Sequence, residues 1–221
     1  MKQDARAAAL QALLQVEESE GYSNIVIDKT IRQMALPPRE AALASALFYG
    51  VLEKRVAIDW ALNRFSKKPV EKLDAPVREL LRLAVYQLLY MDKIPDSAAV
   101  NEAVKACRQA GKSSASGFVN GVLRNFLRHR ETLPWPETGV EGLAVRYSCP
   151  AHWITFWQKA YGEDFCHHLL ESLTHQPFLY GRVNPLRGSV EDFIEKAAET
   201  GMKVTPVESV PGAVRLEHTG S

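Results

Sequence analysis

Apolar residues recur with a helical period through most of residues 1–130, and this pattern constrains the fold more than any other feature of the sequence. Three stripes with the spacing i, i+3, i+4, i+7, i+8 begin at Leu43, Leu81 and Val119. This spacing places apolar side chains on one face of an α-helix. Prolines and glycines that would interrupt a helix, such as Pro69 and Gly111, lie between the stripes. The pattern predicts a compact bundle of about six or seven helices.

The pattern changes after a Pro-rich stretch that begins at residue 133. We expect a helical domain over 1–133, a linker over 134–148 and a small subdomain over 149–221. In the last part, two short helices should precede strands at 179–183, 204–207 and 213–216. A helix capped by Ser189, with Asp192 at the reciprocal position, should follow the first strand. The predicted fold class is therefore mainly α, with an incomplete RRM-like α+β subdomain. Because a complete module has the order β-α-β-β-α-β, we expect a larger protein to continue past Ser221.

The small net charge of +1 conceals a division along the chain. Residues 1–130 carry 20 Lys and Arg against 14 Asp and Glu, whereas residues 131–221 carry 7 against 12. No acidic residue lies between Glu102 and Glu131, although six basic residues lie there. Such clustering is typical of a surface that binds a polyanion. The two parts of the chain are therefore expected to have different partners.

The stripe that begins at Val119 leaves Asn120, Arg124 and Arg128 together on the opposite helix face. Arginines at this spacing can contact successive phosphates, and an amide can reach a base edge or the backbone. An ordinary solvated helix face is the alternative. Phe118 could stack on a base or belong to the core.

The sequence offers no catalytic, cofactor or metal site. Gly111-Lys112-Ser113 lacks the upstream glycine and strand of a P-loop, and the histidines lack the spacing of metal ligands. Cys149 has no base nearby in the sequence, so a structural role is favoured over that of a nucleophile. Three cysteines without a CxxC pair, and no apolar run long enough for a bilayer, favour the cytoplasm.

Residues 99–104 (AVNEAV) and 117–124 (GFVNGVLR), with 80–88 upstream, closely resemble the NusB-like helical RNA-binding domain. This domain occurs alone in transcription antitermination factors and at the N-terminus of 16S rRNA cytosine-C5 methyltransferases of the Sun/Fmu (RsmB) family. Residues 146–153, 181–185 and 213–217 resemble the linker and the small subdomain that precede the methyltransferase domain in that family. The two resemblances together favour the methyltransferase family.

The resemblance implies that this chain is the RNA-binding N-terminal part of an enzyme that uses S-adenosylmethionine. In the family, the attacking cysteine and the cofactor loop belong to a domain that would follow residue 221. Cys149 matches neither family cysteine motif, so this chain alone should be inactive and should bind no cofactor. Its expected partners are 16S rRNA and the methyltransferase domain, and no membrane.

The resemblance also implies that RNA contacts lie on the basic surface of the helical part. The expected RNA-binding residues are Lys2, Arg6, Arg82, Lys105, Arg108, Lys112, Phe118, Asn120, Arg124 and Arg128. Two other functions remain open. One is a stand-alone antitermination or RNA-binding protein without enzymatic activity, and the other is a helical protein-interaction domain whose basic face is incidental.

Overall fold

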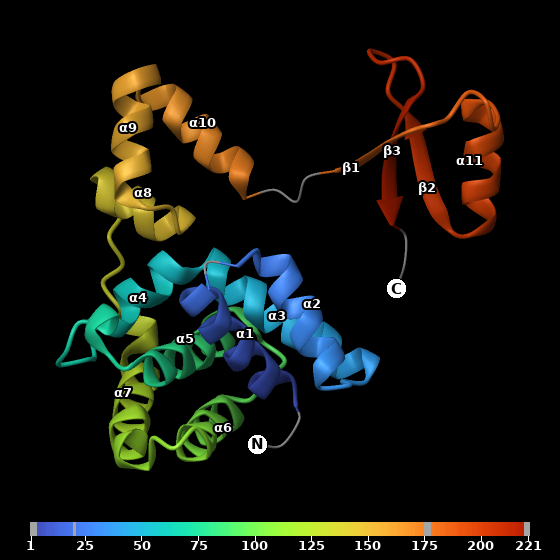
Figure 1. The fold of residues 1–221 in the computed structure, drawn as a ribbon. Coiled ribbons are helices and arrows are strands. Elements are labelled where there is room, and N and C mark those ends of the chain that lie inside the picture. Colours follow the sequence, from blue (N-terminus) through green and yellow to red (C-terminus); the bar gives the residue numbers. More distant parts are fainter. Residues whose placement is uncertain (1–3, 20, 175–177, 219–221) are drawn as a thin grey trace. The chain divides into compact units, whose positions relative to one another are not determined.

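The protein is described by a computed structural model that covers residues 4–19, 21–174 and 178–218. By their internal contacts, the residues form two compact units, Met1–His167 and His168–Ser221. The first unit is helical, and the second contains a small sheet (Figure 1). The helical elements of the first unit are α1 (Ala5–Ser19), α2 (Ser23–Gln33), α3 (Pro38–Glu53), α4 (Arg55–Asn63), η1 (Val70–Lys72), α5 (Ala75–Tyr90), α6 (Asp96–Gln109), η2 (Ser113–Ala115), α7 (Ser116–His129), η3 (Arg130–Thr132), α8 (Gly139–Tyr147) and α9 (Ala151–Tyr161).

Helix α5 lies at the centre of the bundle, where it contacts α1, α3, α4, α6 and α7. Because helices surround it, α5 is buried on almost every side, and Leu81, Ala84 and Val85 are completely buried. The five helices that contact α5 each bury apolar residues, as amphipathic helices do. Leu47 of α3 and Leu123 of α7, for example, are both completely buried. The predicted helical bundle is confirmed.

The segment after α7 differs from a free linker. Helix α8 lies within residues 134–148, which the sequence assigns to a linker, and it packs against α4. Ser148 ends α8 in a left-handed conformation (φ 50°), and its hydroxyl accepts the N–H groups of Val56 and Ala57, 3.1 and 3.4 Å away. These groups belong to the first turn of α4, which has no cap of its own. The sequence did not predict α8, because prolines precede it in this segment. The division of the chain into domains at residues 133 and 149 stays a prediction.

Helices α9 and α10 (Glu163–Leu173) have an unusual distribution of aromatic side chains. Ile154 is completely buried, but the aromatic side chains of Trp153 and Phe156 are about half-exposed. The unit boundary at residue 167 falls within α10.

The second unit contains β1 (Leu179–Arg182), α11 (Val190–Glu199), β2 (Met202–Pro206) and β3 (Ala213–His218). Its antiparallel sheet has the strand order β1-β3-β2. The predicted β-α-β-β order is confirmed, as is the capping box of Ser189 and Asp192, whose two hydrogen bonds are both 3.0 Å long. The fold class is therefore confirmed as mainly α, with a small α+β subdomain that contains a three-stranded antiparallel sheet.

Candidate nucleic-acid interface

Helices α6 and α7 follow each other in the chain and pack together at one side of the bundle, and we call them the α6–α7 hairpin (Figure 1). Helix α7 buries Val119, Val122, Leu123 and Phe126 against the core, so its opposite face is exposed to solvent. Between the helices, Gly111 adopts a φ of +75°, which a residue with a side chain rarely does. The positions of these apolar residues in α7 therefore determine which face of the helix a ligand can reach.

The exposed face of α7 carries the predicted row of polar side chains. Arg124 and Arg128 are both exposed, and neither forms an ion pair with another described residue. The Arg124 Nε donates to the Asn120 Oδ1 over 2.9 Å, and the Arg128 Nε donates to the Arg124 carbonyl over 3.4 Å. These contacts hold both guanidinium groups along the helix while their terminal nitrogens stay accessible. Two arginines one turn apart therefore form a cationic row on the exposed face of α7.

The other basic residues of the hairpin differ in their exposure and in their ion pairs. Lys105 and Arg108 are exposed on α6, and the Lys105 Nζ lies 3.5 Å from a carboxylate oxygen of Glu102. Lys112 is half-buried, and its Nζ pairs with the Asp74 Oδ2 over 2.7 Å. A phosphate would compete with Asp74 for Lys112, whereas Arg108 has no ion pair among the described residues.

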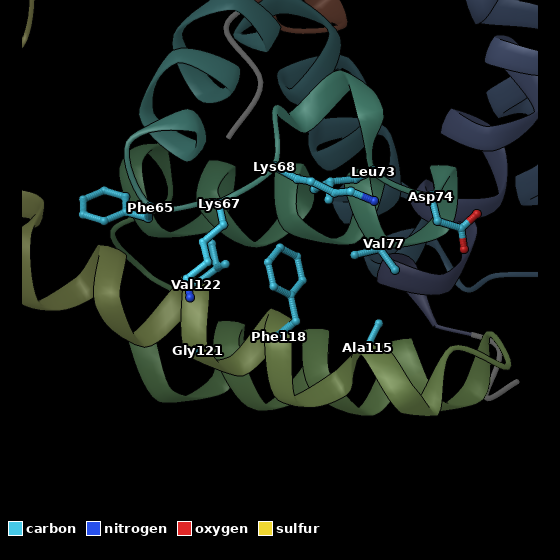
Figure 2. A pocket seen from close by; sticks show the side chains of 10 residues that line it. All are labelled: Phe65, Lys67, Lys68, Leu73, Asp74, Val77, Ala115, Phe118, Gly121 and Val122. Atoms are coloured by element: carbon cyan, nitrogen blue, oxygen red, sulfur yellow. The ribbon is translucent and has the colours of Figure 1, made fainter.

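A groove of about 500 Å³ separates α7 from the segment that joins α4 to α5 (Figure 2). Phe118 stands in this groove with its ring half-buried, and Phe65 and Val77 contribute apolar walls. Lys67 and Lys68 are exposed at its rim. Phe118 is thus intermediate between a core residue and a fully exposed one: its ring packs against the core and keeps part of its surface accessible. The sequence analysis missed both lysines, although their adjacency in a loop before a proline was a usable signal.

Arg6 lies beside this hairpin, but its side chain is hydrogen-bonded to a buried residue of α5. Its Nε donates to the Oε1 of the buried Gln87 over 2.8 Å, and it lines a small cavity together with Glu102 and Ala103 of α6. Lys2 lies outside the described residues. The structure therefore brings Arg6 close to α6.

The expectation for Arg82 is wrong, because the structure buries it. Its exposed fraction is 5%, and its guanidinium donates to Asp59 over 2.7 and 2.6 Å and to Glu79 over 2.5 Å. Burial lowers the pKa of Arg82, but the hydrogen bond to Asp59 and the charge of Glu79 raise it, and the net direction is upward. Arg78, one turn earlier, is likewise buried and paired with Glu17. Arg82 holds α4 and α5 together and cannot present its charge to RNA.

The described residues contain no group of three or more His, Cys, Asp or Glu side chains placed to hold a metal ion. Burial raises the pKa of the Cys149 thiol, which lowers its thiolate fraction and disfavours a role as a nucleophile. Among the helices of the described residues, none has the length and apolar character that crossing a membrane requires.

The fold and this surface define the class of protein: a helical bundle that exposes a cationic helical hairpin to solvent, with a small α+β unit after it in the chain. Residues 3–128 match the NusB family, and the chain belongs to that family. Residues 149–221 match the ferredoxin-like domain of RsmF/B-like methyltransferases. The predicted resemblance to the N-terminal part of the RsmB family is therefore confirmed.

Relatives and solved structures agree with these matches. The Bacillus subtilis (strain 168) protein named "Probable ribosomal RNA small subunit methyltransferase B" is 33% identical over 218 residues, which are 97% of this chain and 48% of that protein. The crystal structure of PH0851 has a TM-score of 0.70 and 20% identity, and the match covers all of this chain and 50% of that one. NusB in complex with NusE and dsRNA has a TM-score of 0.53 at 18% identity, over 57% of this chain and 96% of that chain. This chain spans about half the length of the curated relatives it matches.

Proposed function

We propose that this chain is the RNA-binding N-terminal part of an rRNA small subunit methyltransferase, and that the α6–α7 hairpin grips 16S rRNA through its phosphates. The observation that carries the proposal is the pair of exposed, unpaired arginines, Arg124 and Arg128, on α7 of a NusB-family domain. Arginine binds phosphate strongly because its planar fork can donate two parallel hydrogen bonds to one anion.

The groove beside the hairpin suggests how an unpaired base is held. Phe118 offers a ring face for stacking, and Lys67 and Lys68 at the rim can contact the phosphates on either side of the base. Lys105, Arg108 and Lys112 would extend the phosphate track along α6, and Arg6 and Asn120 would position it. Loops and unpaired bases are the usual targets of specific RNA recognition, so a 16S rRNA loop is the expected ligand.

The chemistry is assigned to the part of the relatives that this chain does not match. Methyl transfer from S-adenosylmethionine to C5 of a cytosine would take place in that part, and this chain would hold the rRNA for it. On its own, the chain should neither bind S-adenosylmethionine nor transfer a methyl group. Its expected location is the cytoplasm, where rRNA is assembled.

A stand-alone RNA-binding module that pairs with a ribosomal protein is the second candidate. The likeness to a NusB solved with NusE and dsRNA favours it. The match of residues 149–221 to an RsmF/B-like methyltransferase domain favours the first proposal, because a free NusB-like factor has no use for that segment.

The test is fluorescence anisotropy with labelled 16S rRNA fragments. The double variant Arg124→Glu, Arg128→Glu removes two charge-assisted contacts worth about 1.5 kcal/mol each, so affinity should fall about 100-fold. The matched control is Lys29→Glu, Arg32→Glu, which reverses two exposed cations on α2 and should change affinity less than about threefold. Equal losses in the two variants would mean that only the total charge matters.

A further inference from the structure

Three cationic side chains of the second unit have no ion pair and line one pocket. Residues 178–218 contain five Lys and Arg residues against six Asp and Glu residues. Two of the five, Lys203 and Arg215, pair with the carboxylate of Glu217. The other three are exposed, form no ion pair with a described residue, and line a pocket of about 220 Å³: Arg182, Arg187 and Lys196. The positive charge of the second unit that is free to bind a ligand is therefore concentrated at this pocket.

The pocket lies where the chain passes from β1 to α11 (Figure 1). Arg182 is the last residue of β1, Arg187 lies in the connecting loop, and Lys196 lies in α11. The loop is held by a turn, in which the Asn184 Oδ1 accepts the Leu186 N–H over 3.0 Å and the Asn184 carbonyl accepts the Arg187 N–H over 2.9 Å. Cations from a strand, a hydrogen-bonded loop and a helix thus converge on one place.

One carboxylate shares the pocket with these cations. Asp192 lines it, and its Oδ2 accepts the Ser189 N–H over 3.0 Å. The hydrogen bond from the Ser189 backbone and, to a smaller extent, the charge of Lys196 lower the pKa of Asp192, so the carboxylate is ionised at neutral pH. Three positive charges against this one still leave the pocket cationic. The other acidic residues of α11 lie on a separate helical row and do not line the pocket: Glu191, Glu195 and Glu199.

The pocket also has an apolar wall. Phe193 is 37% exposed and lines the pocket together with Val183. A phosphate with its attached nucleoside fits this mixture, because guanidinium groups donate to phosphate oxygens while an aromatic ring packs against a sugar or a base. The Ser189 Oγ already accepts the Asp192 N–H over 3.0 Å in the first turn of α11. Side chains, and not the helix N-terminus, would therefore hold the anion.

We propose that Arg182, Arg187 and Lys196 bind one phosphodiester group of the rRNA, with the adjoining nucleotide against Phe193. The glutamate row beside the pocket would repel a longer stretch of backbone, so one phosphate is expected here and not a track of phosphates. The proposal rests on the proposed function, because the ligand is the same rRNA. It adds a contact in the second unit, which is acidic as a whole.

The test measures binding of labelled 16S rRNA fragments to the full 221-residue chain by fluorescence anisotropy over a salt series. Arg182→Gln, Arg187→Gln removes both guanidinium groups, and affinity should fall about tenfold. The slope of log affinity against log salt should become shallower by about 0.7, the contribution of one phosphate. Lys196→Gln on α11 is an independent variant that should also weaken binding. The matched control Lys29→Gln, Arg32→Gln makes the same charge change on α2 and should alter affinity less than about threefold.

Backbone amide chemical shifts in NMR spectra distinguish this proposal from the proposed function. The unlabelled RNA fragment should shift amides between residues 183 and 189 in the wild type, and also in Arg124→Glu, Arg128→Glu at an RNA concentration that saturates this variant. Shifts between 183 and 189 without shifts on α7 would support this contact and contradict the role of the hairpin. Shifts on α7 alone would overturn this contact and leave the proposed function intact.

Three other results would overturn the proposal. The first is an equal loss of affinity in the pocket variant and in the α2 control. The second is displacement of the RNA from residues 183–189 by inorganic phosphate at an equal concentration of phosphate groups, because the pocket would then recognise free phosphate. The third is an equal set of shifts with a poly-glutamate peptide, which would assign the pocket to an acidic protein.

Discussion

The helical unit and the sheet unit differ in how completely they bury their own apolar surface. In the helical unit, α5 is enclosed by five other helices, and even charged side chains such as Glu79 are completely buried in ion pairs. In the sheet unit, only Ala197 and Val214 of residues 178–217 are buried. The helical unit therefore has an apolar core of its own, whereas the described residues of the sheet unit leave most of their side chains in contact with solvent.

The largest contrast should appear when equal side chains are truncated in the two units. Leu81→Ala in α5 removes a completely buried side chain and should lower the free energy of unfolding by about 2–5 kcal/mol. Leu179→Ala removes a side chain that is 66% exposed and should cost less than about 0.5 kcal/mol. Urea denaturation followed by far-UV circular dichroism measures both. Similar losses would contradict the difference in burial.

The second contrast is between a buried and an exposed arginine. Arg82→Ala leaves the carboxylates of Asp59 and Glu79 without their main partner and should destabilise the helical unit by about 3 kcal/mol. RNA affinity per folded molecule should not change. Arg124→Ala should do the opposite, with stability within about 0.5 kcal/mol of the wild type and weaker RNA binding. Thermal unfolding and anisotropy on the same samples separate the two effects, and an Arg82→Ala protein that is stable but defective in binding would restore Arg82 to the interface.

A smaller effect is expected where α8 joins the bundle. Ser148→Ala removes the hydroxyl that accepts the Val56 and Ala57 N–H groups and should cost about 1 kcal/mol. Ser148→Gly is the informative companion, because it loses the same hydroxyl but relieves the φ of 50°. We expect Ser148→Gly to be the more stable of the two in urea denaturation. The reverse order would show that the left-handed conformation carries no strain.

The smallest effect should be confined to the sheet unit. Ser189→Ala removes one half of the capping box, so local opening of α11 measured by hydrogen exchange should increase about fivefold, with no change in α5. The backbone N–H of Ser189 lowers the pKa of Asp192. A lowered pKa in the folded state means that the stabilisation is present at neutral pH and is lost as the pH falls through that pKa. Exchange in α11 should therefore accelerate in acid before exchange in α5 does.

The sequence predicted those features that depend on local spacing. The stripes that begin at Leu43, Leu81 and Val119 predicted their helices because each helix buries most of that stripe, and Ser189 with Asp192 predicted a cap because both lie in one turn. The exposed Arg124 and Arg128 followed from the same rule.

Features that depend on distant residues were not predictable in this way. Arg82 has polar spacing within its own helix, but Asp59 of α4 pairs with it and neighbouring helices cover it. The groove at Phe118 forms from α7 and a loop some 50 residues earlier, so its lysines gave no periodic signal. Helix α8 begins in a Pro- and Gly-rich stretch and is held by contacts with α4.

The central claim, that Arg124 and Arg128 grip RNA phosphates, is tested most directly by the salt dependence of 16S rRNA binding. Each phosphate contact contributes about 0.7 to the slope of log affinity against log salt for single-stranded RNA. The slope of the Arg124→Glu, Arg128→Glu variant should therefore be shallower than that of the wild type by about 1.4. The Lys29→Glu, Arg32→Glu control should keep the wild-type slope. Equal slopes for the wild type and the α7 variant would contradict the claim.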